Sequence, residues 1–170
     1  MNKFFFWLQI PFIYILLSGC KYKSTDPRYS GEKSVYIEVV QNHTLAPQIG
    51  SLVGHKLREH ILRRGHFNIT SNPKKGDFFV QIILKNYTKN SEIFFFEDTI
   101  IASGFRLNIN AVVTLSNSNG KLLIDQAVVN EKVSVLRKDS LTKPLDRQAL
   151  LALSESLGRQ ISQLIENFKW

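Results

Sequence analysis

The stretch from Gly104 to Ser116 constrains the fold of this chain most, because apolar residues occupy every second position along it. A period of two predicts an antiparallel strand with one face in the core. The turn sequence Asn117-Ser118-Asn119-Gly120 follows, and Asn-Gly is the strongest short hairpin signal. Lys121–Leu136 is therefore expected to return as the paired strand. The predicted inner residues are Phe105, Leu107, Ile109, Ala111, Val113 and Leu115, and the predicted outer residues are Arg106, Asn108, Asn110, Val112 and Thr114.

Two other segments repeat apolar residues with a helical period. The first opens at Pro47, which suits a first helical turn, and is expected to stop at Gly65. Its apolar stripe comprises Ile49, Leu52, Val53, Leu57, Ile61 and Leu62. The second runs from Pro144 to Phe168, with a stripe of Leu150, Leu153, Leu157, Ile161, Leu164, Ile165 and Phe168. Its predicted solvent side comprises Ser154, Glu155, Arg159, Gln160 and Gln163.

Three further segments have strand character. Ser34–Val40 would place Val35, Ile37 and Val39 on one face, Phe67–Ile69 would be short, and Phe78–Tyr87 is apolar enough to be central. Ser91–Ser103 either extends two long strands or forms a projecting loop. Together these elements predict an α+β, two-layer sandwich: two amphipathic helices packed on one face of a mixed, mostly antiparallel four-stranded sheet.

The N-terminus has the layout of an export signal. Lys3 precedes an apolar run, Phe4–Leu17, that spans only about 21 Å as a helix, short of the roughly 30 Å hydrocarbon core of a bilayer. Leu17-Ser18-Gly19-Cys20 resembles the lipobox of bacterial lipoproteins, and a chance cysteine at the end of an ordinary signal is the competing interpretation. The lipobox implies a signal peptide over 1–19 and a diacylglycerol and an N-acyl chain, such as palmitate, on Cys20. Residues 20–33 would be the lipidated N-terminus and tether, and 34–170 a single domain.

The net charge of +8 over 170 residues suggests anionic partners, such as lipid head groups, lipopolysaccharide or other acidic envelope polymers. Nucleic acid is not expected, because the chain carries an export signal and lacks a basic run or an aromatic RNA-binding motif. Lys21, where an aspartate would signal retention at the inner membrane, favours the outer membrane.

The sequence contains no catalytic or metal-ligating constellation. Its four histidines lack ligand spacing, and Cys20 is its only cysteine. We therefore expect no enzyme activity, no metal and no cofactor beyond the acyl chains. The candidate site residues are cations that either keep the surface soluble or bind phosphates: Arg106, Lys121, Arg137, Lys138 and Lys143.

The chain after the signal resembles the lipopolysaccharide-assembly lipoprotein (LptE) family. Four stretches carry the resemblance in order: Val35–Thr44, Leu62–Phe67, Asn72–Asp77 and Gly104–Leu115. It implies a plug inside the large outer-membrane β-barrel of the lipopolysaccharide translocon, which supports assembly of that barrel and helps to deliver lipopolysaccharide. It also implies that basic residues near the central strands and before the last helix contact lipopolysaccharide. The five cations named above are the candidates for that contact.

The resulting functional hypothesis is a non-enzymatic lipoprotein, anchored by its lipid at the periplasmic face of the outer membrane, that partners a translocon barrel in lipopolysaccharide transport. An envelope lipoprotein that regulates a cell-wall synthase is the alternative. The residues between Cys20 and Ser34 reach about 40 Å at most, which keeps the domain near its membrane and favours the first hypothesis. An envelope hydrolase is disfavoured, because no catalytic set is found.

Overall fold

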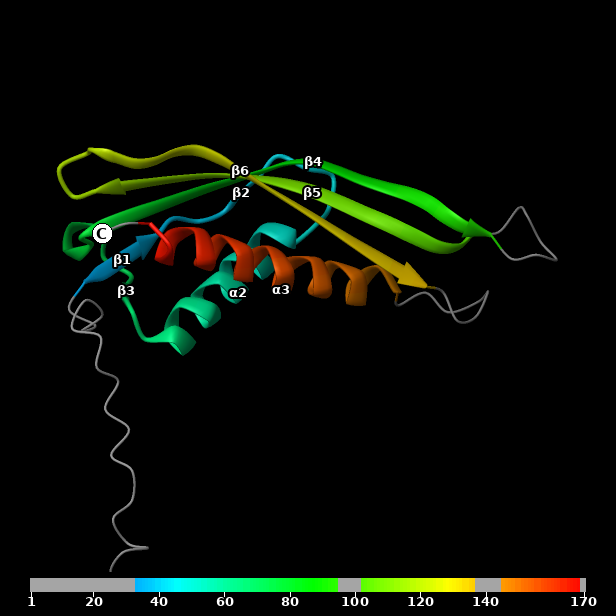
Figure 1. Cartoon of the computed structure of the whole chain (residues 1–170), viewed down its shortest axis with the longest axis horizontal. Helices are drawn as coiled ribbons and strands as arrows, with labels where there is room; N and C mark the ends of the chain where they lie inside the picture. Colours follow the sequence, from blue (N-terminus) through cyan, green and yellow to red (C-terminus); the bar gives the residue numbers. More distant parts are fainter. Residues whose placement is uncertain (1–32, 95–101, 137–144, 169–170) are drawn as a thin grey trace, which may run out of the picture.

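The computed structural model describes residues 33–94, 102–136 and 145–168. The strands form one layer, and both helices lie on the same side of it (Figure 1). In chain order the elements are β1 (Ser34–Ile37), β2 (Gln41–Asn42), α2 (Ile49–Arg64), β3 (Asn68–Thr70), the 3₁₀ turn η2 (Pro73–Lys75), β4 (Phe78–Phe94), β5 (Ala102–Asn117), β6 (Leu122–Leu136) and α3 (Leu145–Glu166). The predicted α+β architecture with two helices against one sheet is confirmed.

The sheet is mixed, as predicted, but it has six strands among the described residues, so the predicted four-stranded, mostly antiparallel arrangement is wrong in detail. Its order is β3-β1-β4-β5-β6, with β2 paired to β4. β1 runs parallel to both β3 and β4, because the chain crosses over through α2 before it returns to the sheet. β2 is also parallel to β4, and at two residues it is too short to show a period in the sequence. Among the described strands, only the β4–β5 and β5–β6 pairs are antiparallel.

The long strands β4, β5 and β6 extend beyond the helices (Figure 1), and β5 confirms the predicted alternation. Its inner residues Leu107, Ile109, Ala111, Val113 and Leu115 are all buried. Gly120 has the positive φ of 77° that the tight turn before β6 requires. The predicted hairpin is therefore present.

Helix α2 begins two residues after Pro47 and ends where predicted. The Gly65 N–H donates to the Ile61 carbonyl at 3.3 Å, and Gly65 has a φ of 69°. Ile49, Val53, Leu57 and Ile61 are fully buried. Leu62 is 60% exposed, which corrects its predicted place in the stripe: one helical step of about 100° past Ile61 carries it to the solvent side.

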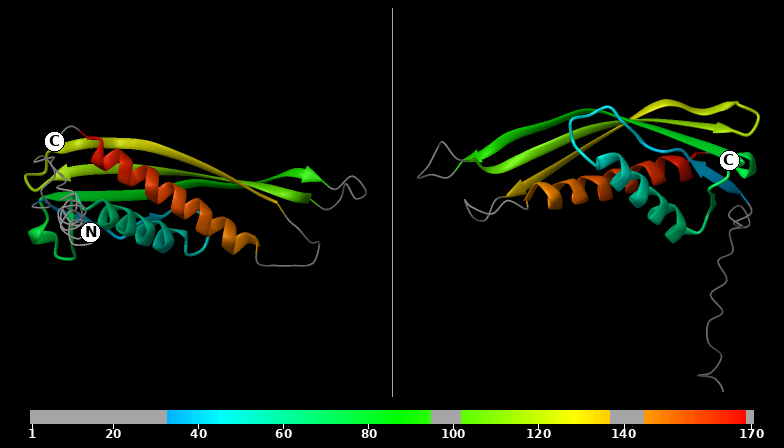
Figure 2. Two further views of the ribbon diagram at one scale, coloured as in Figure 1. Left: turned by 60° about the horizontal axis from the view of Figure 1, so that its bottom comes forward. Right: turned by 180° about the vertical axis from the view of Figure 1, so that it is seen from behind.

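Helix α3 buries the predicted Leu153, Leu157, Ile161 and Ile165. Ser154, predicted on the solvent side, is instead fully buried, and its hydroxyl donates to the Leu150 carbonyl at 2.7 Å. Helix α2 lies over this side of α3. A Cβ added to Gly158 would lie 3.0 Å from the backbone nitrogen of Leu57, so the two helices cross in close contact here. Figure 2 shows this crossing beneath the sheet.

The predicted inward face of the first strand is only partly correct. Val35 and Ile37 are buried, but Val39 is 85% exposed and Val40 is buried in its place. The regular strand ends at Ile37, so the alternation does not continue to Val39.

The predicted signal, Cys20 and nearly all of the tether lie outside the described residues, as does the centre of Ser91–Ser103. In the part of the chain that is described, neither helix combines the length and apolarity needed to cross a membrane.

Candidate functional site

The structure separates the predicted cations. Arg106 lies on β5, exposed on the sheet face opposite the helices, whereas Lys121 follows the β5–β6 turn. Ten residues of strand, about 33 Å, separate Arg106 from Ser116 beside that turn. Arg137, Lys138 and Lys143 lie outside the described residues. Leu136, just before them, pairs with Gly104, near Arg106.

Strand register gathers other polar residues around Arg106. Residues paired across strands point to the same face of a sheet. Three consecutive rows cross β4, β5 and β6 on the outer face, and none of their members is buried. We call these nine residues the cationic patch: Lys85–Asn110–Asn130, Thr88–Asn108–Lys132 and Asn90–Arg106–Ser134.

A β-bulge in β4 determines which side chains enter the patch. The register of β4 shifts between Lys85 and Thr88, and Asn86 has a φ of 55°. An inserted residue reverses the facing of the strand beyond it. Thr88 therefore joins the patch and accepts a hydrogen bond from Asn108 Nδ2 at 3.0 Å. Lys89 moves to the helix side, where its ammonium lies 4.6 Å from the centre of the Phe105 ring.

The charged side chains of the patch are all positive. Its charged residues are Lys85, Arg106 and Lys132, and none of its nine members is acidic. Strand spacing places these cations roughly 8–14 Å apart at their backbones. The Asn108 Oδ1 atom is buried without a hydrogen-bond partner among the described residues. Such a surface can hold several phosphates: arginine grips them through two bonds, lysine acts as a point charge, and asparagine amides donate hydrogen bonds.

The same outer face becomes apolar next to the patch. The adjoining row is Ile83–Val112–Val128, and Val128 is 59% exposed. Further along β4, the Phe79 ring packs edge-to-face on Tyr36, with ring centres 6.0 Å apart. One continuous face thus offers cations at one end and apolar side chains beside them, an arrangement suited to an amphiphilic ligand.

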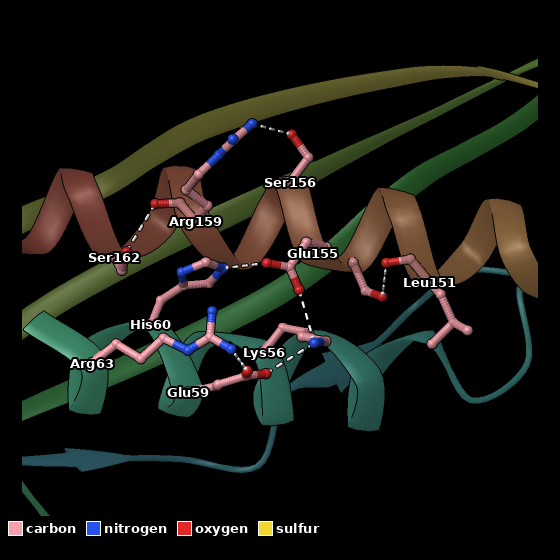
Figure 3. A network of polar contacts seen from close by, with 10 residues as sticks. Lys56, Glu59, His60, Arg63, Leu151, Glu155, Ser156, Arg159 and Ser162 are labelled. Atoms are coloured by element: carbon pink, nitrogen blue, oxygen red, sulfur yellow. Dashed lines mark hydrogen bonds and ion pairs between the residues drawn. The ribbon is translucent and has the colours of Figure 1, made fainter.

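A second polar cluster links the two helices (Figure 3). Lys56 on α2 lies 2.8 Å from Glu155 on α3 and 2.9 Å from Glu59, and His60 Nε2 lies 2.9 Å from Glu155. The hydrogen bond from Lys56 is the main cause that lowers the pKa of Glu155, and it also lowers that of Glu59. These groups neutralise one another, so we interpret the cluster as a helix–helix link.

Sequence reasoning missed Lys85 and Lys132. Both lie within strands that were predicted, but their place beside Arg106 depends on the register shifts. The available signal was their outward position in each strand, which is insufficient without the pairing. Across the described ranges, no group of three or more His, Cys, Asp or Glu side chains could hold a metal ion.

The fold is similar to that of a number of solved structures, among them the following two. A hypothetical protein, CT253, from Chlamydia trachomatis aligns with a TM-score of 0.57 at 8% identity, covering 80% of this chain and 96% of its own. A minor lipoprotein from Acinetobacter baumannii aligns with a TM-score of 0.53 at 10% identity, covering 78% of this chain and 91% of its own. At such identities the likeness concerns the fold alone. No curated protein matches the sequence.

One family match covers most of the sequence and agrees with the resemblance noted from its motifs. The model described as "LptE: Lipopolysaccharide-assembly" matches residues 32–166, from just before β1 to the last residue of α3. The matched range therefore contains both helices and all six strands that the structure describes. The chain belongs to the LptE lipopolysaccharide-assembly family.

Proposed function

We propose that this protein is a non-enzymatic, lipid-anchored component of lipopolysaccharide assembly at the periplasmic face of the outer membrane, where it partners the translocon β-barrel. The family match over residues 32–166 carries the proposal. The lipobox ending at Cys20 supports the anchor, since stable membrane attachment takes more than one acyl chain.

The cationic patch is the proposed contact for lipopolysaccharide. This lipid joins anionic phosphates to apolar chains, and the outer face joins Lys85, Arg106 and Lys132 to the row Ile83–Val112–Val128. The phosphates would bind the cations and the patch amides, while the start of the acyl chains would lie on the apolar row. Arg137, Lys138 and Lys143 remain candidates because their segment follows β6, whereas Lys121 lies at the far end of the sheet.

Charge reversal tests this contact. The triple variant Lys85→Glu, Arg106→Glu, Lys132→Glu should weaken binding of purified lipopolysaccharide at least about tenfold at low salt, because each reversal replaces attraction by repulsion. The difference from the parent protein should shrink as salt rises, since salt screens exposed charges. Lys74→Glu, Lys75→Glu, Arg147→Glu is a matched control with the same change in net charge at exposed positions outside the patch. Equal weakening in both variants would mean that net charge, and not the patch, governs binding.

Partnership is tested by isolating the lipidated protein from detergent-solubilised outer membrane. A large β-barrel recovered at a one-to-one ratio is the expected result. Recovery of a cell-wall synthase in its place would support the alternative function. Cys20→Ala should yield a folded protein that leaves the membrane fraction, because the proposed anchor is on that cysteine.

A further inference from the structure

Strand β6 forms a long edge of the sheet. β6 is the last strand in the order β3-β1-β4-β5-β6, so only one of its edges is paired among the described strands. The strand is 15 residues long and contains no proline. Long unpaired edges are ordinarily protected, because their backbone N–H and C=O groups can pair with another chain.

A groove of about 830 Å³ lies beside this edge. Val128, Val129 and Asn130 form its strand wall. Consecutive strand residues point to opposite faces of a sheet, yet all three line one groove. The groove must therefore run along the edge of β6 and not lie on either face.

Helix α3 supplies the opposite wall through Arg159, Gln160, Gln163 and Leu164. These positions lie on one stripe of the helix, and the C-terminal half of α3 lies next to β6 (Figure 2). The edge and the helix thus form two sides of a slot that is open to solvent.

The charged side chains in and beside the slot favour an occupant with negative charge. Gln160 already bonds to Glu131 on β6, which ties the helix wall to the strand. Arg159 is the only charged residue among those that line the groove, and its side chain is exposed. Lys132 adds a second exposed cation two residues beyond Asn130. A chain in the slot would therefore gain from carrying carboxylates.

We propose that the β6 edge is a strand-acceptor site for an extended, carboxylate-bearing segment of another protein. The segment lies about 4.8 Å from β6, pairs its backbone with the exposed edge, and directs alternate side chains towards the α3 wall and the outer face. Its carboxylates meet Arg159 and Lys132. The site shares Asn130 and Lys132 with the cationic patch, but pairing uses the backbone edge of β6, so it can be tested by hydrogen exchange without lipopolysaccharide.

The test uses the full-length mature lipidated protein in detergent and a synthetic peptide that repeats Thr-Thr-Glu-Glu, with blocked ends, so that glutamates lie on both faces of the strand. We expect the peptide to slow amide hydrogen exchange in 122–136, with no comparable change in β3 at the opposite edge. A peptide of the same sequence with N-methylated backbone amides at alternate positions should give no protection, because it cannot pair as a strand.

The charge requirement is tested on the protein side. Arg159→Glu should weaken binding of the glutamate peptide about tenfold, equivalent to about 1.4 kcal/mol, and should favour a peptide with lysine in place of glutamate. Arg147→Glu, an exposed arginine on the same helix outside the groove, should bind as the parent does. These variants replace exposed side chains, so folding is not at issue.

Three results would overturn the proposal. The first is unchanged exchange in β6 at saturating concentrations of the glutamate peptide. The second is equal protection by the N-methylated peptide, which would mean that contact does not involve backbone pairing. The third is protection of β6 that grows with protein concentration and no peptide, which would identify a second copy as the occupant.

Discussion

The two faces of β5 show how one strand can serve stability and recognition separately. On the inner face Leu107, Ile109 and their neighbours at every second position are buried against the helices. On the outer face Arg106, Asn108 and Asn110 remain accessible and pair across strands with other polar residues. Because the two sets alternate residue by residue, substitutions on one face should leave the other nearly unchanged.

The largest effect should come from a direct comparison of adjacent residues on β5. Ile109→Ala removes fully buried apolar volume and should lower the free energy of unfolding by about 2–5 kcal/mol. Asn110→Ala, one residue away on the outer face, should change it by no more than about 0.5 kcal/mol. Urea unfolding followed by circular dichroism measures both. Similar losses would show that the outer face also supports the fold.

A substitution where the two helices cross should destabilise the helix layer without changing any residue of the sheet. Gly158→Val places methyl groups against the backbone of Leu57 at the helix crossing and should cost about 1–3 kcal/mol. Ala152→Val is the control, because Ala152 is exposed on the same helix. Both are measured by urea unfolding, and an equal loss in the control would point to helix propensity and not to the crossing.

The bulge that brings Thr88 into the cationic patch can be tested at Asn86. Asn86→Val puts a branched side chain at a φ of 55° and should cost about 1–2 kcal/mol. Asn86→Gly keeps that conformation accessible and should retain both stability and lipopolysaccharide binding. Thermal unfolding and the lipid-binding assay read out the two effects. A stable valine variant would argue that the register of β4 tolerates loss of the bulge.

The smallest effect concerns the start of the sheet and depends on pH. Asp77 Oδ2 accepts hydrogen bonds from the Ser34 backbone N–H and hydroxyl, each at 2.7 Å, and these lower the pKa of Asp77 from its ordinary value of 3.8. A lowered folded-state pKa contributes stability above 3.8 that is lost as the pH falls through the folded-state value.

Asp77→Asn should therefore be slightly less stable than the parent at pH 7, and the gap should close in acid below the folded-state pKa. Melting temperatures measured from pH 7 to pH 2 test this. A gap of constant size across that range would exclude the carboxylate as its source.

The helices and the β5–β6 hairpin could be predicted from sequence, because a burial period of 3.6 or 2 is written in consecutive residues. The register of β4, β5 and β6 against one another could not be predicted in this way. Ser116 pairs with Leu122 next to the turn, and a straight continuation would place Asn108 opposite Asn130. Two register shifts place it opposite Lys132 instead. A bulge inserts one extra residue and leaves no periodic signal in the sequence. The sequence therefore predicted only one cation of the patch, Arg106.

The parallel placement of β1 affects the order in which the fold can assemble. β4, β5 and β6 follow one another and can pair through short connections, which form quickly. β1 is synthesised before them, yet its place lies between β3 and β4, so it must wait until residues 68–80 are available. Closing that longer loop carries a larger entropic cost. We expect the first strand of the domain to be among the last to acquire its partners, and the β4–β6 meander to act as the template on which it docks.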